Sequence, residues 1–488
     1  MSVVPVIINK LSVSEFGLIS LLNSLLSYLA VATIAITSSL GRNLIFSREK
    51  GEGESSKELS TVIVAIVVLG ALLLPILYIY SKDILMLMGI DSLYLDESTK
   101  ILKTMFFLFF INAVSNAIGA TFFFKNRLDI LSVSSFITQV STHFFFLILL
   151  IFSSIGLMSY IIAMTLTTSI LFFYTYIMYK KHSPEINVKI KLFSLSKVKS
   201  TLGMSSWLII NQVGVLIIFQ CGILIVNQYE GLESVGYLAV GLIIATQIRV
   251  TSTLISSLFE PTLMKCVAEN DIIKSNRIFK KIVLVISMIV GFICGIYIGS
   301  ADYVLTLWLG SYDPMIKKIS IFSIVYLPLI LGFSSAWPLL MAHNKVKIGA
   351  VITLITGVLH VFISLILYNL LSIGVYSVLL STIIVMVFKN NILTPLLLQS
   401  LGINVTKALI YGLCGLIYMI ITAFITKAIF SLINEVDLFI VLFFLSASSL
   451  LALTFPVILL MLNSSIPISK FFKSPKQSIL TIIKEISK

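Results

Sequence analysis

The chain has 488 residues, of which 58% are hydrophobic and only 11% are charged, and its formal net charge is +13. Soluble globular proteins carry about a quarter of their residues as charged side chains, so this composition excludes that class and predicts an all-α polytopic membrane protein. The four cysteines form no C-x-x-C pair, and H-E-x-x-H, P-loop and G-x-S-x-G motifs are absent from the sequence. We therefore expect no metal site, no cofactor and no enzymatic activity.

Runs of about 20 apolar residues, the length that crosses a bilayer as a helix, recur along the chain. They predict thirteen full spans, preceded by an apolar stub at residues 2–9. The predicted spans cover residues 16–40, 59–80, 101–124, 130–152, 157–179, 202–227, 235–259, 279–299, 318–341, 348–369, 373–394, 406–430 and 438–462. A basic amphipathic tail follows at 466–488, and we expect it to lie on the anionic cytoplasmic leaflet.

Lysine and arginine residues are distributed unevenly between the two predicted sides of the membrane. When successive loops are assigned to alternate sides, 26 of the 34 Lys and Arg residues fall on one side and 7 on the other, and Arg249 lies within a span. Short cytoplasmic loops hold the excess of these residues, so the connection at 181–200 and the C-terminus are predicted to be cytoplasmic. The positive charge thus follows membrane topology, and we expect no nucleic-acid partner.

An internal repeat with an offset of 219 residues places Gly17 on Gly236. In both copies a short acidic loop precedes a helix that starts with glycine and is rich in Ser and Thr in its second half. The repeat predicts two six-helix lobes with a linker, two added helices and a tail, at residues 1–180, 181–200, 201–400, 401–465 and 466–488. The stub matches only the end of the helix at 202–227, so we expect a truncated first helix whose beginning lies upstream of Met1.

Arg249 is the one formal charge near the middle of a predicted span, at 235–259. An arginine at mid-bilayer costs about 2.5 to 3.5 kcal/mol on insertion scales, so it normally faces a wet cavity or a partner. Four hydroxyl residues lie three, four or seven positions away and share its helix face: Thr246, Ser252, Thr253 and Ser256. We interpret Arg249, with Thr246 and Ser252, as a substrate-binding site. The alternative is snorkelling to the interface, but the Glu260 end of the helix is about 15 Å away.

Amide side chains recur on one face of the span at 202–227, where Gln212 and Gln220 are eight residues apart. The equivalent face of the span at 16–40 carries Asn23, and Ala30 stands where the repeat places Arg249. Amides in hydrocarbon need hydrogen-bond partners, so they either line a cavity or bond between helices. We predict that all three amides contribute to the substrate site.

Two histidines lie within predicted spans, His143 and His360. Each could titrate near neutral pH and couple transport to a proton, or it could be a neutral packing residue. Arg42 and Glu260 mark the predicted cytoplasmic ends of two repeat-related helices. We assign them to a cytoplasmic gate, with a simple interfacial position as the alternative.

The segment from Leu11 to Glu52 carries a recognisable pattern. It resembles the start of the Wzx-type polysaccharide-biosynthesis flippases of the MOP superfamily, which begin with Leu-x-x-x-Glu-(Phe/Tyr)-Gly-Leu and leave the second helix through a Ser-x-x-Arg-like sequence. The matching residues here are Leu11, Glu15, Phe16, Gly17, Leu18, Ser39 and Arg42. The resemblance extends over the whole chain in span number, lobe repeat, basic linker and tail.

This resemblance implies a MATE-like fold in which two lobes surround a central cavity. It also implies a bacterial inner-membrane protein, acting as a monomer, that moves an undecaprenyl-diphosphate-linked oligosaccharide, such as an O-antigen unit, to the outer leaflet by alternating access. Its partners would be the bilayer, the polyprenyl-diphosphate-linked glycan, a glycan polymerase and chain-length proteins. Cavity cations of the family hold the diphosphate, and Arg249 is the residue that fits this role.

Two other classes remain as alternatives. A cation-coupled multidrug exporter of the same fold would be expected to hold buried Asp or Glu, and the core of each predicted span lacks acidic residues. A membrane glycosyltransferase or polymerase would need carboxylates on a long outer loop. The longest outer connections, near 81–100 and 300–317, are short, although the first contains Asp83, Asp91, Asp96 and Glu97.

Overall fold

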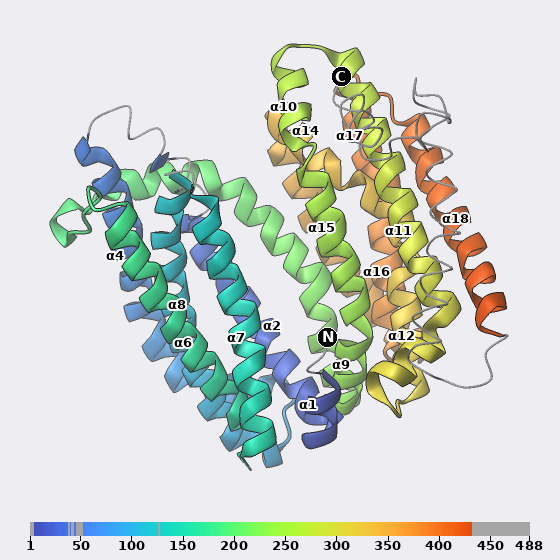
Figure 1. Ribbon diagram of the computed structural model, residues 1–488, viewed down its shortest axis with the longest axis horizontal. Coiled ribbons are helices and arrows are strands. Elements are labelled where there is room, and N and C mark those ends of the chain that lie inside the picture. Colours follow the sequence, from blue (N-terminus) through green and yellow to red (C-terminus); the bar gives the residue numbers. More distant parts are fainter. Residues whose placement is uncertain are drawn as a thin grey trace, which may run out of the picture. The chain divides into compact units, whose positions relative to one another are not determined.

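The computed structural model describes residues 4–37, 40, 43–44, 52–124, 127–153 and 155–431. Every regular element in these residues is helical, which confirms the predicted all-α class (Figure 1). The elements up to α9 are α1 (Val4–Lys10), α2 (Val13–Thr37), α4 (Glu52–Ile79), α5 (Ser81–Leu87), α6 (Ser92–Phe124), α7 (Leu128–Phe152), α8 (Met158–His182), η1 (Ile190–Leu192) and α9 (Leu195–Ser257). Those after α9 are α10 (Glu260–Ala268), α11 (Ile272–Leu309), α12 (Pro314–Ile324), α13 (Leu327–Ile330), η2 (Leu331–Ser335), α14 (Ala336–Ala342), α15 (Val346–Leu371), α16 (Tyr376–Phe388), η3 (Lys389–Leu393), α17 (Thr394–Gln399) and α18 (Thr406–Phe430).

Within the described residues, eleven helical segments are long and apolar enough to cross a membrane. One of them, Ser206–Ser257, covers most of two predicted spans, 202–227 and 235–259. The loop expected between those spans is absent: α9 continues to either side of Gly231, whose φ of 81° and ψ of −176° make a kink. Only glycine adopts this conformation without strain, so one residue replaces the expected loop. The predicted span at 438–462 and the tail at 466–488 lie outside the described residues.

The chain forms two compact units, Met1–Gly236 and Tyr237–Lys488. The division falls within α9, shortly after the Gly231 kink, whereas the sequence pattern places the limit between the lobes at the basic linker, residues 181–200. The lobe limits drawn from the repeat remain predictions. Each unit has its own buried apolar clusters.

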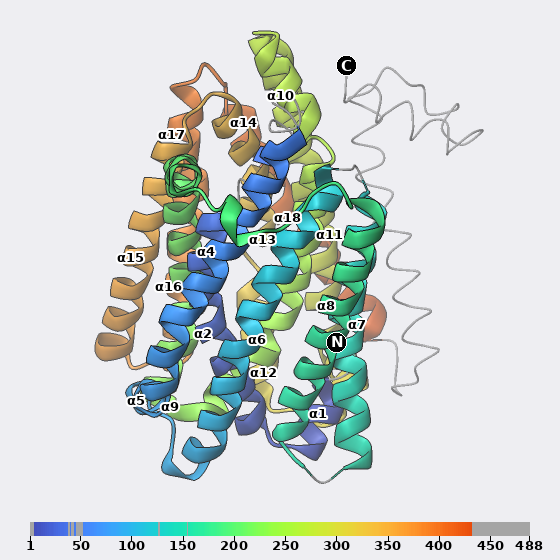
Figure 2. The ribbon, with the colours of Figure 1, turned by 90° about the vertical axis from the view of Figure 1, so that its left-hand side faces the viewer.

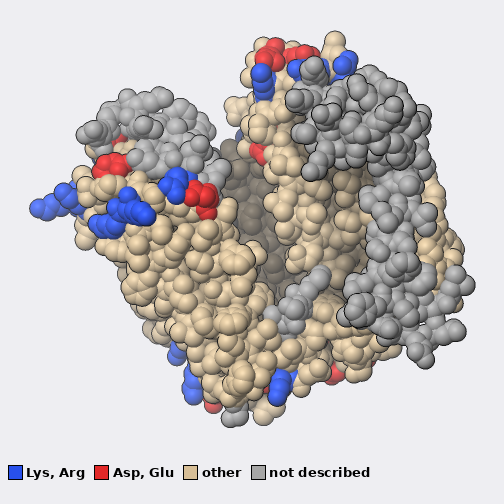
Figure 3. Space-filling model, in the orientation of Figure 1, with Lys and Arg blue, Asp and Glu red and all other residues tan. Residues whose placement is uncertain are grey.

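In the first unit, α4, α6 and α8 pack beside one another and α7 packs on α8 (Figures 1 and 2). Phe106 and Phe122 of α6 are fully buried in its core, while Leu72 and Ile79 of α4 are among its exposed apolar residues. Figure 3 shows that Lys and Arg gather near the helix ends. An apolar surface between charged ends is what a bilayer requires of a spanning bundle.

The two glycines that the internal repeat aligns, Gly17 and Gly236, contact one another in the first unit. A Cβ atom on Gly17 would lie 2.2 Å from the carbonyl oxygen of Leu232 and 2.8 Å from the nitrogen of Gly236. A Cβ atom on Gly236 would lie 2.2 Å from the carbonyl oxygen of Val13. No side chain fits at either position, so α2 and residues 232–236 of α9 meet at backbone contact.

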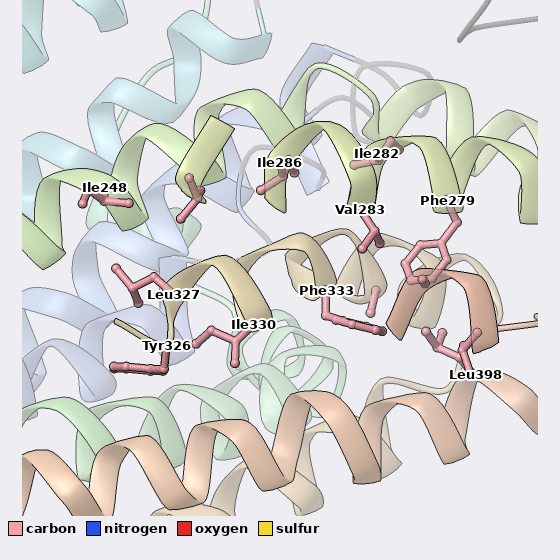
Figure 4. Close-up of a cluster of buried hydrophobic side chains, with 14 of the residues drawn as sticks. Ile248, Phe279, Ile282, Val283, Ile286, Tyr326, Leu327, Ile330, Phe333 and Leu398 are labelled. Atoms are coloured by element: carbon pink, nitrogen blue, oxygen red, sulfur yellow. The ribbon is translucent and has the colours of Figure 1, made fainter. Parts of the chain in front are cut away.

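The second unit contains an extensive contact between α11 and α18. Gly291, Gly295 and Gly299 are spaced four residues apart on α11 and face α18, where an added Cβ would lie 2.3 to 2.6 Å from a carbonyl oxygen. Small residues at this spacing allow two membrane helices to approach closely, because lipid provides no hydrophobic force to hold them together. Nearby, the buried cluster includes Phe279 and Phe333, whose rings meet edge to face (Figure 4).

The span Pro314–Ala342 agrees in extent with the prediction but is broken into α12, α13, η2 and α14. Pro328 lacks the N–H that would bond the carbonyl oxygen of Ile324, so a continuous helix would leave this oxygen unsatisfied. Cys294 of α11 donates its thiol proton to that oxygen, with an S···O distance of 3.6 Å. Cys294 therefore supports the helix break at Pro328.

Candidate substrate-binding site

Arg249 lies on α9 beyond the Gly231 kink, and its side chain is half-buried. Its Nη2 atom donates a hydrogen bond to the hydroxyl of Tyr326, with an N···O distance of 2.5 Å. Tyr326 is buried between α12 and α13, where its ring packs among apolar residues that include Ile248 and Ile330 (Figure 4). The helix break at Pro328 positions the tyrosine, and the tyrosine in turn orients the guanidinium.

The hydroxyl residues predicted to share one polar stripe with Arg249 are divided by burial. Ser252 and Ser256 are buried, whereas Thr246 and Thr253 are exposed. Arg249 lies at the boundary between these flanks, because successive residues of a helix are about 100° apart around its axis. The predicted single stripe is therefore divided in two. The serines lie on a buried side of Arg249 and the threonines on an exposed side.

The threonine hydroxyls of this site donate hydrogen bonds to backbone carbonyl oxygens of their own helix. Thr246 donates to the carbonyl oxygen of Leu242 and Thr253 to that of Arg249, both at 2.9 Å. Ser252 differs, since its Oγ atom is buried and has no hydrogen-bond partner among the described residues. A buried polar atom is normally paired, so Ser252 offers a donor one turn from the guanidinium.

A guanidinium and a hydroxyl in an apolar span are suited to an oxyanion. Arginine presents five N–H donors in a planar fork that can bind two phosphate oxygens at once. The bond from Nη2 to the Tyr326 hydroxyl orients this fork, and its acceptor is a neutral group. In a low-dielectric environment such a charge-assisted pair is stronger than in water.

The predicted amides lie in the first unit. Asn23 of α2 pairs with Tyr160 of α8, at 2.9 Å from its Nδ2 and 3.1 Å from its Oδ1 to the tyrosine hydroxyl. Gln212 and Gln220 are both half-buried on α9. The pairing of Asn23 is the interhelical alternative weighed from the sequence, and a substrate-binding role for the three amides remains a prediction.

The two histidines have different surroundings. His143 is exposed on α7, with its Nδ1 atom 2.6 Å from the carbonyl oxygen of Gln139. His360 is fully buried, and Ser381 of α16 donates to its backbone oxygen at 2.7 Å and lies 2.9 Å from its Nδ1 atom. Because the serine proton goes to the carbonyl oxygen, Nδ1 is the donor to the serine and Nε2 is left without a partner in the described part of the chain. Proton coupling by either residue remains a prediction.

Of the two predicted gate residues, Arg42 lies outside the described residues. Glu260 is half-buried at the first position of α10, followed by Pro261. A carboxylate in the first turn interacts favourably with the helix dipole, which is sufficient to explain its position. Its role in a gate therefore remains a prediction.

The basic linker is attached to the start of α4, a contact that the sequence pattern does not reveal. Ser60 accepts a hydrogen bond from the backbone N–H of Lys189 at 3.1 Å, and Lys197 contacts Glu54 at 2.7 Å and Glu58 at 2.6 Å. Partial burial opposes the charge of Lys197, but the two carboxylates prevail and raise its pKa above the usual value. At least one cation of the basic region, Lys197, is thus paired with carboxylates of α4.

Tyr326 is the main site residue that sequence reasoning missed. The available signal was its place two residues before Pro328 in the middle of an apolar span, since proline interrupts helical hydrogen bonds there. Discontinuous helices near the membrane midplane commonly form binding sites in transporters. Packing between α9 and the α12–α13 region decides which side chain at the break reaches Arg249, and the sequence pattern does not give this packing.

A family model and a curated relative match this chain. A family model described as "Polysaccharide biosynthesis protein" matches residues 10–317. An uncharacterized membrane protein of Bacillus subtilis (strain 168), EpsK, is 26% identical over 402 residues, which cover 80% of this chain and 78% of EpsK.

Solved transporters share the fold. An inward-facing multidrug resistance MATE family transporter of the MOP superfamily is 13% identical, with a TM-score of 0.61 over 88% of this chain and 96% of that chain. The lipid II flippase MurJ, in an inward closed conformation, is 16% identical, with a TM-score of 0.61 over 90% of this chain and 96% of that chain. At these identities the similarity establishes the fold, and the predicted MATE-like architecture is confirmed.

Proposed function

The chain belongs to the polysaccharide biosynthesis protein family, and from this premise we propose that it is a flippase for an undecaprenyl-diphosphate-linked oligosaccharide. It carries the sugar unit, such as an O-antigen repeat, from the cytoplasmic to the outer leaflet of the bacterial inner membrane by alternating access. It acts as a monomer without a cofactor, and its step connects glycan assembly in the cytoplasm to a polymerase and chain-length proteins outside.

The Arg249–Tyr326 pair is the observation that carries this proposal. A cation within an apolar span is suited to bind an anion, and a diphosphate is the anionic part of the proposed substrate. The planar fork, which Tyr326 orients at Nη2, binds one phosphate. The predicted contribution of Ser252 would require its buried hydroxyl to become accessible to the same group. The diphosphate is thereby transferred from water to a polar site, while the lipid tail of the substrate stays in hydrocarbon.

A cation-coupled multidrug exporter is a second candidate, because a MATE multidrug transporter has the same fold. A cationic drug would be repelled by a guanidinium in its path, and the cores of the predicted spans lack the carboxylates that would attract it. The charge of the site therefore supports an anionic substrate over a cationic one.

Substitution of Arg249 tests the proposed function. Arg249→Ala should abolish surface glycan while the protein still accumulates in the membrane, and Arg249→Lys should recover part of the export because it keeps the charge without the fork. Arg127→Ala is the matched control, since its guanidinium pairs with Asp129 at 2.7 Å in a partly exposed ion pair at a helix end. Unchanged glycan export per folded molecule in Arg249→Ala would exclude the phosphate-binding role.

The proposed orientation has a separate test. From the lysine and arginine distribution, residues 181–200 and the C-terminus are cytoplasmic. A cysteine in place of Lys191, which is exposed, should therefore resist a membrane-impermeant thiol reagent in intact cells. Labelling at this position before lysis would reverse the orientation.

A further inference from the structure

Helix α15 of the second unit buries its small and polar residues and exposes apolar ones. Its buried residues are Gly349, Ala350, Thr353, Thr356, Gly357, His360, Ser364 and Tyr368. Its exposed residues include Ile355, Phe362 and Leu370, which are suited to lipid. The buried side packs in part on α16, with which α15 makes an extensive contact (Figure 1). Polar groups on this side need hydrogen-bond partners inside the protein, because hydrocarbon offers none.

The register of α15 against α16 is set by His360 and Ser381. The Ser381 hydroxyl lies 2.7 Å from the backbone oxygen of His360 and 2.9 Å from its Nδ1 atom. The two helices are joined by residues 372–375 alone, and so short a connection makes them antiparallel neighbours. Ser364 lies one turn further along α15, and Ser377 lies one turn back along α16. In an antiparallel pair these two steps run in the same direction, so Ser364 and Ser377 face each other at the next level.

Three polar atoms at these two levels have no hydrogen-bond partner among the described residues: Nε2 of His360 and the hydroxyls of Ser364 and Ser377. All three residues are fully buried. A buried serine usually donates to the carbonyl oxygen one turn before it, which for Ser364 is that of His360. This oxygen already accepts from Ser381 and from the helical N–H of Ser364, so both of its lone pairs are used. Ser377 is the second residue of α16, and the residue four positions before it lies in the connection, outside the helix.

The chemistry of this site selects a small neutral ligand. Residues 353–368 of α15 and 377–388 of α16 contain no Lys, Arg, Asp, Glu or Cys, so the site offers neither a cation for an anion nor carboxylates for a hard metal ion. Among the described residues, no group of three or more His, Cys, Asp or Glu side chains is placed to hold a metal. Water both donates and accepts, and a buried water typically makes about three hydrogen bonds to groups that otherwise lack partners. Serine side chains are small, and these two do not bond to each other, so a water can lie between them.

We propose that the hairpin of α15 and α16 holds an internal water bound by His360, Ser364 and Ser377. The water donates to Nε2, which accepts because Nδ1 carries the ring proton, and it exchanges hydrogen bonds with the two hydroxyls. It thereby satisfies three atoms that the helices cannot pair directly and stabilises the hairpin. Because Ser381 occupies Nδ1, any proton that His360 takes up passes through this water to Nε2. The assignment does not depend on the proposed function.

Water-edited solid-state NMR of the full-length protein in lipid bilayers tests the proposal. The chain has 4 histidines, so isotope-labelled histidine gives few imidazole signals, and His360→Gln identifies the signal of His360. Magnetisation from water should reach Nε2 of His360, and this transfer should fall to the noise level in the Ser364→Ala/Ser377→Ala double variant. Ser300→Ala is the matched control, because this fully buried serine of the same unit donates to the Ile296 carbonyl oxygen at 2.7 Å within its own helix. It should leave the His360 signal unchanged.

Thermal unfolding in detergent gives a second measurement, in which a hydrated and a dry site differ in sign. If the water is bound, Ser364→Ala and Ser377→Ala should each lower the unfolding midpoint by about 2 to 4 °C. The double variant should lose less than the sum, because the two serines share one ligand. In a dry site each substitution removes an unpaired buried hydroxyl, so the midpoint would stay the same or rise.

Three results would overturn the internal water. They are no water transfer to His360 in the unsubstituted protein, transfer that the double variant leaves unchanged, and an unchanged or raised midpoint in both single variants. Transfer that the double variant removes, together with lowered midpoints in the single variants, supports the site even if Arg249→Ala exports glycan normally.

Discussion

Tyr326→Phe tests whether the tyrosine positions Arg249 for its substrate. The substitution keeps the buried ring and its packing and removes only the hydroxyl that accepts the bond from Nη2 at 2.5 Å. Hydrogen bonds to charged groups contribute about 1.5 to 3 kcal/mol. At about 1.4 kcal/mol per factor of ten, the loss should reduce binding of the anion roughly 10- to 150-fold if the whole interaction is expressed in the bound state.

The measurement is glycan export at limiting substrate, normalised to the amount of folded protein in the membrane. Tyr297→Phe is the matched control, because it removes from the same unit another buried tyrosine hydroxyl, which donates to Ser320 at 2.7 Å. That neutral bond is worth about 1 kcal/mol of stability and should not affect export per folded molecule.

A double substitution distinguishes positioning from simple packing. If Tyr326 acts by orienting the planar fork of Arg249, Tyr326→Phe should cost little further export in an Arg249→Lys background, which keeps part of the export but has already lost the fork. Equal export by Tyr326→Phe, Tyr297→Phe and the unsubstituted protein would refute the positioning role. Additive losses in the double variant would show that the two residues act independently.

Three further predictions concern stability and coupling. Gly236→Ala should lower the midpoint of thermal unfolding in detergent, since its Cβ would overlap a backbone oxygen and overpacking costs about 1 to 3 kcal/mol; Gly53→Ala, with open space at its Cβ, should not. Lys197→Met should destabilise the protein by about 1.5 to 3 kcal/mol by removing the partner of buried Glu58. The pKa of Lys197 is raised, so the difference in unfolding free energy should persist below the usual lysine pKa of 10.5 and decrease only as the pH rises through the folded-state value. A decrease between about pH 6 and about pH 9 would contradict this expectation. His360→Gln should leave the pH profile of export unchanged if the ring only packs, and a flattened profile would show that it carries the proton.

Several features of this protein follow from its sequence alone, because they depend on local chemistry. The helical class and most span positions follow from the length of apolar runs, since a bilayer admits only closed hydrogen-bonding structures of a set length. Arg249 stands out because a charge in such a run is costly wherever its partners lie. The repeat aligned Gly17 with Gly236, and both positions require glycine where the helices cross.

Other features were decided only by tertiary structure. Tyr326 became a partner of Arg249 because Pro328 breaks a span and packing against α9 turns the tyrosine toward the guanidinium, a contact 77 residues apart in the chain. Packing also divided the hydroxyl stripe, paired Asn23 with Tyr160 and brought Ser381 to the backbone of His360. Periodicity gives the face of a helix on which a residue lies, but the neighbour that covers this face depends on how the helices pack, and that choice sums many small contacts from distant parts of the chain.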